Sequence, residues 1–369
     1  MASVEGARAS RIFLTHSPYH CLLAYAIAAD DDVPSVLCYR PYYPRAQARP
    51  FFEFLQSLDI FVECHLLASM YRDQNTWKRP LARMPAKHRN FTRMRSIIQG
   101  HPIREVCGVL DDRDLTQFVM QSATAVSEEP VRCSIIEDGA GIYTPLSSRK
   151  RWTPYTFPSL HAWLHRRMYG YSYQPPPAVG FYGDFELVDR LYAHAPAHVA
   201  DRYSEHEVVG IPAWPLGAID HTSIRALLAD STLAWGQLEE IDGIVLAPYL
   251  GSSEATARFA QVMHRLTEAG IRVGYKPHPR LKLPEVGSRE SVVIMPAHLP
   301  SELLLVALSN VSFILGIGST ALLAAKWIDA DLTALSVGEL VSTHQPAAVF
   351  GAVGVRLCDS LEDIEREVL

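Results

Sequence analysis

Two adjacent carboxylates stand directly after an apolar run in the first half of the chain. Glu137 and Asp138 follow Ile135 and Ile136, and Gly139 then lets the chain turn. A carboxylate held at the end of a strand can take a proton from a substrate hydroxyl, which is the work of a general base. The same residues also suit an ordinary turn whose acids cap the next helix or stay in water. Taken alone, this acidic turn favours the second interpretation.

A histidine framed by two prolines forms the second candidate site, in the string Lys276-Pro277-His278-Pro279-Arg280. The prolines restrict the backbone on both sides of His278 and hold its imidazole in one place. Lys276 and Arg280 add positive charge, so this group could protonate or hydrogen-bond a departing phosphate. A surface loop is the alternative interpretation, because the chain contains 15 histidines.

Small residues and two hydroxyls precede a predicted helix in the last third of the chain. Gly316, Gly318, Ser319 and Thr320 follow an apolar run. Backbone N–H groups at a helix N-terminus, helped by hydroxyls, bind phosphate oxygens well. Ordinary N-capping by Ser319 accounts for the same residues. No GK[ST] string follows, so this turn is not a Walker loop.

Each of these motifs follows a predicted strand in a chain that alternates strands and helices. The first helix begins after Ser17 and Pro18, which suit the N-cap and the first helical position. Parallel strands place their carboxyl ends at one sheet edge, where α/β folds bind ligands. We therefore expect an α/β protein with two facing Rossmann-like domains, residues 1–215 on the acceptor side and 216–369 on the nucleotide side. The predicted strands are 11–15, 33–39, 60–67, 105–110, 133–136, 241–248, 271–275, 311–315 and 332–337.

Composition narrows the class of protein. Of the 369 residues 48% are hydrophobic, which excludes a disordered chain, and a net charge of −6 argues against a general nucleic-acid binder. The six cysteines form no CxxC pair and indicate buried free thiols in the cytoplasm. No secretory signal pattern begins the sequence. Residues 303–325 carry no charge, yet their polar and glycine residues indicate helix, strand and helix rather than a membrane span.

Basic residues gather in one segment of this acidic chain. Residues 74–104 contain eight Lys or Arg and no Asp or Glu, and Arg149-Lys150-Arg151 lies in the same half. A solvated helix face and a site for an anionic glycan or membrane surface explain the segment equally well. The second interpretation predicts peripheral contact with the inner membrane through residues 78–104.

The three motifs together resemble the signatures of bacterial sialyltransferases of the lipooligosaccharide and polysialic acid type. That family has an acidic pair before glycine, a His-Pro dipeptide and a Ser-Ser or Ser-Thr pair, in the order found here. The string at 276–280 is similar to the family's lysine-x-His-Pro-Arg string. Pro296-Ala297 with Ser301-Glu302-Leu303-Leu304 resembles its ribose-binding stretch, and Thr15-His16-Ser17-Pro18-Tyr19-His20 resembles its first strand–helix turn. Short islands between residues 11 and 340 carry the whole resemblance.

The resemblance implies a GT-B fold and an inverting, metal-independent transfer of sialic acid from CMP-sialic acid to a glycan hydroxyl. Asp138 would act as the base, with Glu137 close behind and Glu254 as a rival at the start of the second domain. His278 would assist the departure of CMP. No cofactor besides the donor is implied, and the acceptor would belong to lipooligosaccharide or capsular polysaccharide. The implied CMP-binding residues are Lys276, Pro279, Glu302, Gly318, Ser319 and Thr320.

Several other activities fit the same pattern. CMP-Kdo or another CMP-nonulosonate could replace CMP-sialic acid as the donor, and glycerophosphate transferases also carry a His-Pro loop and a serine pair. A nucleotide-sugar 2-epimerase would need no acceptor, and a non-catalytic binder would hold CMP without turnover. The sequence leaves open whether the chain forms a homo-oligomer.

Overall fold

The structure is a computed structural model in which the chain divides into two compact units, Met1–Pro212 and Ala213–Leu369. The residues that it describes are listed by their numbers: 9–69, 84–110, 114–143, 158–174, 183, 185–199, 203–215, 219, 221–229, 235–247, 253–277, 290–296, 299–308, 310–338 and 347–368.

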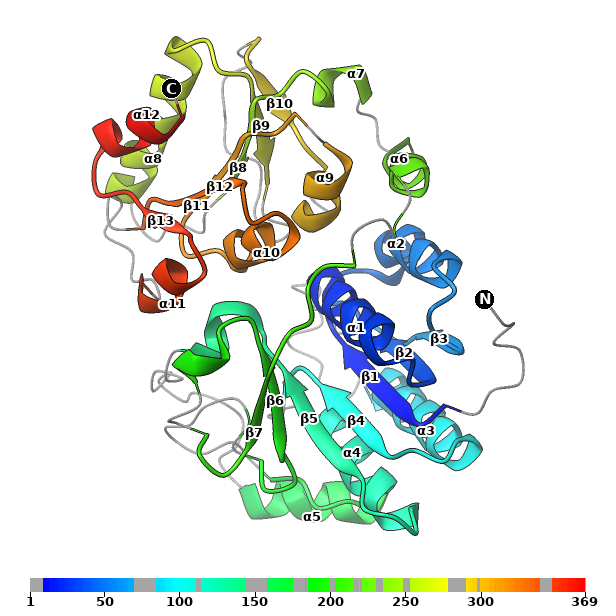
Figure 1. Ribbon diagram of the computed structural model, residues 1–369. Coiled ribbons are helices and arrows are strands. Elements are labelled where there is room, and N and C mark those ends of the chain that lie inside the picture. The colour runs from blue at the N-terminus through cyan, green and yellow to red at the C-terminus, as the bar shows by residue number, and fades with distance from the viewer. Residues whose placement is uncertain are drawn as a thin grey trace. The chain divides into compact units, whose positions relative to one another are not determined.

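The first unit is an α/β domain built on one parallel sheet of seven strands, in the order β3-β2-β1-β4-β5-β6-β7 (Figure 1). Helices alternate with the strands along the chain. The elements are β1 (Arg11–Thr15), α1 (Pro18–Asp31), β2 (Ser35–Tyr39), α2 (Arg45–Ser57), β3 (Glu63–Leu66), α3 (Met84–Gly100), β4 (Glu105–Gly108), α4 (Asp114–Val126), β5 (Arg132–Ile136), the 3₁₀ turn η2 (Gly139–Tyr143), α5 (Pro158–Tyr169), β6 (Arg190–Ala193), η3 (Pro196–His198) and β7 (Glu207–Gly210).

The second unit repeats this design with six parallel strands, in the order β10-β9-β8-β11-β12-β13. The elements are α6 (His221–Ala229), α7 (Trp235–Leu238), β8 (Gly243–Leu246), α8 (Ser253–Glu268), β9 (Val273–Lys276), β10 (Val292–Ile294), α9 (Ser301–Ala307), β11 (Phe313–Gly316), α10 (Thr320–Ile328), β12 (Thr333–Ser336), α11 (Ala347–Ala352), β13 (Arg356–Leu357) and α12 (Leu361–Val368).

The strand order reverses once in each sheet, between β1 and β4 and between β8 and β11. Such a reversal separates the loops on either side and makes the carboxyl edge of the sheet the usual place for ligands. The acidic turn follows β5, Lys276 ends β9, and the Ser-Thr turn follows β11. The acidic turn, Lys276 and the Ser-Thr turn therefore lie at the carboxyl edges of their sheets, whereas His278 lies outside the described residues.

Local sequence explains how the first unit begins. The strand β1 is wholly buried, and Ser17 then caps α1 by accepting a hydrogen bond from the His20 backbone N–H at 3.3 Å. Pro18 stands at the first helical position. The predicted N-cap and start of α1 are thus confirmed, and the capped start fixes the position of Tyr19 and His20 on the first turn.

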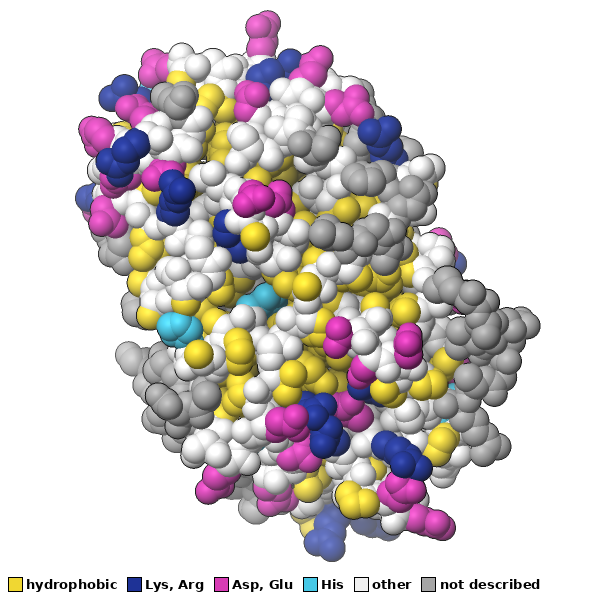
Figure 2. Space-filling model, in the orientation of Figure 1, with side chains coloured by type: hydrophobic (Ala, Val, Ile, Leu, Met, Phe, Trp, Pro, Cys, Tyr) yellow, Lys and Arg dark blue, Asp and Glu magenta, His cyan; other side chains and the backbone are white. Residues whose placement is uncertain are grey.

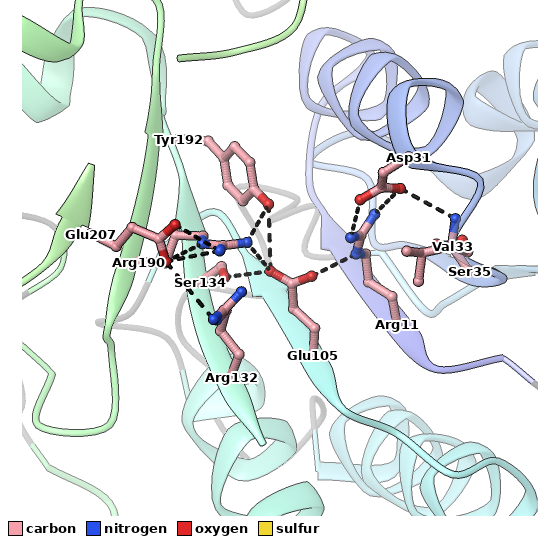
Figure 3. A network of polar contacts seen from close by, with 10 residues as sticks. All are labelled: Arg11, Asp31, Val33, Ser35, Glu105, Arg132, Ser134, Arg190, Tyr192 and Glu207. Atoms are coloured by element: carbon pink, nitrogen blue, oxygen red, sulfur yellow. Dashed lines mark hydrogen bonds and ion pairs between the residues drawn. The ribbon is translucent and has the colours of Figure 1, made fainter. Parts of the chain in front are cut away.

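The amino edge of the first sheet carries a charged network, opposite to the edge with the acidic turn (Figure 3). Arg11 begins β1, and its Nε donates to Glu105 Oε2 on β4 at 2.7 Å while Nη1 donates to Asp31 Oδ1 at 2.9 Å. Arg190 on β6 continues the network, with Nη2 donating to Glu207 at 2.8 Å. Burial alone would lower the pKa of Arg11, but these carboxylates raise it. Paired charges in this network join six elements, namely α1, β1, β4, β5, β6 and β7.

Two predictions about the core are confirmed. The six cysteines are free thiols, and five of them are buried. Residues 303–325 cover the end of α9, all of β11 and the first part of α10, so they fold as helix, strand and helix. Among the described residues, none of the helices has both the length and the apolar character needed to cross a membrane.

The sequence missed four short strands. β6 and β7 extend the first sheet, and β10 and β13 form the outer edges of the second sheet. They contain two to four residues each. Runs this short, at or near a sheet edge, carry little periodic signal, and their pairing with a neighbouring strand defines them.

Candidate active site

The acidic turn places its two carboxylates in different surroundings. β5 ends at Ile136, and Gly139 takes a φ of +56° that most side chains would disfavour. The Glu137 side chain is completely buried, whereas the Asp138 side chain is 36% exposed. Neighbouring acids therefore have separate roles, and only Asp138 lies where a substrate hydroxyl could reach it.

Glu137 anchors the strand ends around the turn. Its Oε1 accepts a hydrogen bond from Tyr19 at 3.0 Å and lies 2.7 Å from His194 Nδ1. Its Oε2 accepts from the Tyr143 hydroxyl at 2.5 Å and from the His194 backbone N–H at 2.8 Å. Tyr143 also accepts from the Ala195 N–H at 3.0 Å. One buried carboxylate thus ties α1, η2 and the end of β6 to the end of β5.

Electrostatics agree with this structural role. Burial by itself would raise the pKa of Glu137, but the charge of His194 and the hydrogen bonds from His194 and Tyr143 hold it below its ordinary value. Glu137 is therefore ionised at neutral pH. A buried carboxylate whose oxygens already accept four contacts is poorly suited to take a proton from a substrate.

Asp138 is held by a histidine of α1. His20 Nε2 lies 2.8 Å from Asp138 Oδ1, and the His20 side chain is 2% exposed. An ionised carboxylate can only accept, so the proton of this contact belongs to Nε2. His20 Nδ1 is buried and has no hydrogen-bond partner among the described residues. The buried imidazole therefore orients the Asp138 carboxylate but does not itself reach a substrate. Of the two side chains, only Asp138 is exposed at the surface.

The Ser-Thr turn of the second unit has the geometry of a helix start. Gly318 takes a φ of +54°, and Ser319 caps α10 by accepting from the Ala321 N–H at 3.3 Å. Ser336, at the end of β12, accepts from the Gly318 N–H at 3.4 Å. Among the residues the structure describes, the N–H groups of Ser319 and Thr320 donate no hydrogen bond. Two donors at this half-buried helix start are left for an anion.

Lys276 and Glu302 are two buried ionisable residues of the same unit, close enough for the charge of Glu302 to act on Lys276. The Lys276 side chain ends β9, and both residues are at most 6% exposed. Burial lowers the pKa of Lys276 to about 8, although the negative charge of Glu302 opposes this change. Lys276 Nζ donates to the Pro277 carbonyl at 3.4 Å, and Ser301 donates to Glu302 at 3.3 Å.

Two of the predicted site residues, His278 and Pro279, lie outside the described residues, so their roles stay predictions. Glu254, the rival base, stands in the first turn of α8 with a 74% exposed side chain. It pairs with Arg258 at 2.7 Å, one helical turn further along. Such a pair is common on a solvated helix face.

Sequence reasoning assigned no role to the partners that hold these motifs. His20, Tyr143 and His194 contact the acidic turn, and Ser336 supports the Gly318 turn. His20 and Tyr19 lie in the string that resembles the family's first turn, which is the one signal that singles them out. His194 and Ser336 each follow or end a strand far along the chain, and only strand pairing brings them close.

Comparisons with known proteins identify the fold. No protein-family model matches the chain, and a search of curated proteins finds no match either. Among solved structures, a UDP-N-acetylglucosamine 2-epimerase is similar with a TM-score of 0.51 and 13% identity, covering 98% of this chain and 86% of that one. The UDP-GlcNAc 2-epimerase from Neisseria meningitidis, bound to UDP-GlcNAc, gives 0.51 and 13%, with 96% and 89% covered. The chain therefore has the α/β fold with two Rossmann-like domains that is called GT-B.

Proposed function

We propose that this protein is an inverting glycosyltransferase that moves sialic acid from CMP-sialic acid to a hydroxyl of a lipooligosaccharide or capsular glycan. The observation that carries the proposal is the half-exposed Asp138 carboxylate, held at a strand end by the buried His20. A carboxylate fixed in this way is a general base for an acceptor hydroxyl. The choice of sialic acid as the sugar and CMP as the nucleotide rests on the resemblance of the ordered motifs to bacterial sialyltransferases.

The proposed reaction needs little beyond holding charges and taking one proton. CMP is a good leaving group, and single displacement inverts the anomeric centre. Asp138 takes the proton of the acceptor oxygen as that oxygen attacks the anomeric carbon. The phosphate of CMP binds the N–H groups and hydroxyls at the start of α10, with Ser319 and Thr320 as its ligands. Glu302 binds the ribose, and His278 hydrogen-bonds the departing phosphate.

Lys276 has a supporting part in this proposal. Its ammonium group, buried beside Glu302, would add positive charge at the end of β9, the strand that leads into the His-Pro string. A positive charge near the departing phosphate stabilises the developing charge on CMP.

An epimerase is the second candidate, because enzymes of that kind share the fold. Two of the similar solved structures are UDP-N-acetylglucosamine 2-epimerases. An enzyme of that kind converts a nucleotide sugar without any acceptor, so the requirement for an acceptor separates the two functions.

An acceptor-array assay tests the proposal. Purified protein is incubated with CMP-Neu5Ac, CMP-Kdo or UDP-GlcNAc, each with and without a panel of oligosaccharide acceptors. We expect CMP release that depends on both CMP-Neu5Ac and an acceptor. Asp138→Asn and His278→Ala should each lower turnover about 100-fold or more. Glu254→Gln is the matched control, because it removes an exposed carboxylate of the second unit, and it should keep near-normal turnover.

Four outcomes would contradict the proposal. Epimerised UDP-sugar without an acceptor would establish the isomerase instead. Transfer only from CMP-Kdo would change the sugar. Near-normal turnover in both Asp138→Asn and His278→Ala would remove the assigned chemistry, and a large loss in Glu254→Gln alone would move the base to the second unit.

A further inference from the structure

One helix of the first unit presents both large apolar and basic side chains to solvent. Among the described residues, three large hydrophobic side chains are strongly exposed, and two of them belong to α5: Trp163 is 59% exposed and Met168 48%. Arg166 and Arg167, in the last turn of the same helix, are also exposed. Arg166 and Arg167 follow Trp163 by three and four positions, so the three side chains share one face.

The opposite side of α5 is pinned to its neighbour α3. His165 is 5% exposed, and its Nε2 lies 3.0 Å from Lys87 Nζ. The ring of Tyr169 packs against the ring of Phe91 with centroids 4.3 Å apart, and Arg95 donates to the Tyr169 carbonyl at 2.9 Å. Packing on one side therefore fixes which side of α5 faces outward, and it exposes an aromatic ring that the core does not use.

Acidic residues are absent from this part of the sequence. Between Gly139 and Gly183 the chain contains five Lys or Arg and no Asp or Glu. On the face drawn in Figure 2, acidic side chains of the described residues lie among the basic ones. The arginines of α5 thus lack the neighbouring carboxylates within their own segment that would neutralise them.

The basic residues of α3 are engaged within the protein. Lys87 pairs with Asp114 at 2.6 Å, and Arg93 lies 2.9 Å from His65. Arg104, just after α3, pairs with Glu129 at 2.6 Å. In the described part of the segment 78–104, these three charges have partners within the protein and Arg89 is exposed. The two exposed arginines of α5 lie beside an exposed aromatic ring, so α5 offers the better anion-binding surface.

We propose that the exposed side of α5, formed by Trp163, Arg166 and Arg167 and bordered by the exposed Met168, docks on a bilayer that carries anionic phospholipids. An indole ring prefers the boundary between lipid headgroups and acyl chains. Arginine binds lipid phosphates while its stem lies on apolar surface. A helix that combines these groups lies in the plane of the interface, with its apolar side chains among the headgroups. This proposal does not rest on the proposed transferase activity.

Vesicle flotation with the purified full chain tests this docking. One set of vesicles contains phosphatidylcholine alone, and the other adds phosphatidylglycerol. We expect binding to the mixed vesicles, weakened by salt. Arg166→Gln with Arg167→Gln, and separately Trp163→Ser with Met168→Ser, should each lower the partition coefficient about tenfold or more. Arg45→Gln with Arg49→Gln is the control, because it removes two exposed arginines from one face of α2, and it should bind like the wild type.

Two further measurements keep the result clear. Circular dichroism and CMP calorimetry report whether each variant is folded, and they separate a loss of docking from a loss of the proposed function. Brominated lipids should quench tryptophan fluorescence in the wild type more than in Trp163→Phe. Absence of binding by the wild type, or equal binding by the α5 variants and the control, would overturn the proposal. Binding to vesicles without anionic lipid that the arginine variant retains would also overturn it.

Discussion

The Nε2 atom of buried His20 lies 2.8 Å from the Oδ1 atom of half-exposed Asp138. The two residues are 118 positions apart in the chain, and the order β1-β4-β5 in the sheet brings them together. The adjacent acids differ in their surroundings, since Glu137 is completely buried and Asp138 is 36% exposed.

Asp138→Asn tests the catalytic half of this division. The amide keeps the shape of the side chain but cannot accept a proton, so kcat should fall about 100-fold or more while the protein stays folded. His20→Ala should lower kcat less, because it loosens Asp138 without removing the carboxylate. Steady-state kinetics with CMP-Neu5Ac and an acceptor measure both. A raised KM with an unchanged kcat in Asp138→Asn would show that Asp138 only binds substrate.

Glu137→Gln tests the structural half. The change removes a buried negative charge that faces His194, and we expect the free energy of unfolding to fall by about 3 kcal/mol at pH 7. Because the folded-state pKa of Glu137 is lowered, the carboxylate stabilises the protein above its unfolded pKa of about 4.3, and this stabilisation is lost as pH falls through the lower folded value. Urea unfolding at several pH values measures the difference.

The difference between wild type and Glu137→Gln should therefore shrink in acid. Asp138→Asn is the matched control, with a change below about 1 kcal/mol expected at this partly exposed site. A stable Glu137→Gln protein at pH 7 would contradict the anchoring role.

The lowered pKa of Lys276 leads us to expect that nucleotide binding depends on pH. Burial lowers its pKa to about 8, so the ammonium loses its proton as pH rises through that value. CMP affinity should then fall above pH 8, by up to about tenfold per pH unit. Lys276→Met should bind CMP weakly with no such dependence, which calorimetry between pH 7 and 9 would measure. Parallel pH profiles for the two proteins would show that Lys276 does not contact the nucleotide.

The same pKa has a consequence for stability. A lysine whose folded-state pKa is lowered below its ordinary value of about 10.4 destabilises the fold while both states are protonated. That cost is relieved as pH rises from about 8 toward 10. Wild-type stability should accordingly increase relative to Lys276→Met over this range, as thermal unfolding without CMP would measure.

Two substitutions separate capping from phosphate binding at α10. Ser319→Ala removes the hydrogen bond from Ala321 and should cost about 1 kcal/mol of stability without any ligand. Thr320→Val removes a hydroxyl that makes no hydrogen bond to any described residue, so stability should hardly change while CMP affinity falls about tenfold. Unfolding curves and calorimetry measure the two effects. Unchanged CMP affinity in both variants would leave only the capping role.

The charged network at the amino edge of the first sheet predicts a stability effect remote from the site. Glu105→Gln leaves Arg11 buried with fewer negative partners, and the free energy of unfolding should fall by about 3 kcal/mol. Arg225→Gln breaks an exposed pair with Glu239 and should change it by less than about 0.5 kcal/mol. A comparable effect of the two changes, in chemical unfolding, would contradict the importance of burial.

The sequence by itself determined the alternation of strands and helices and the placement of each motif after a strand. Buried parallel strands need continuous apolar runs, and those runs are visible at β1, β2, β5, β8 and β11. Helix starts were visible too, because Ser17 and Ser319 cap through local hydrogen bonds within a few residues.

Only the tertiary structure decided which acid is buried and which is exposed. Glu137 and Asp138 are chemically alike and adjacent, so nothing local distinguishes them. Their surroundings come from Tyr19, His20 and His194, which the sheet order brings in from α1 and the end of β6. Contacts between residues more than fifty positions apart depend on strand pairing and burial. The spacing of residues along the chain determines neither of these.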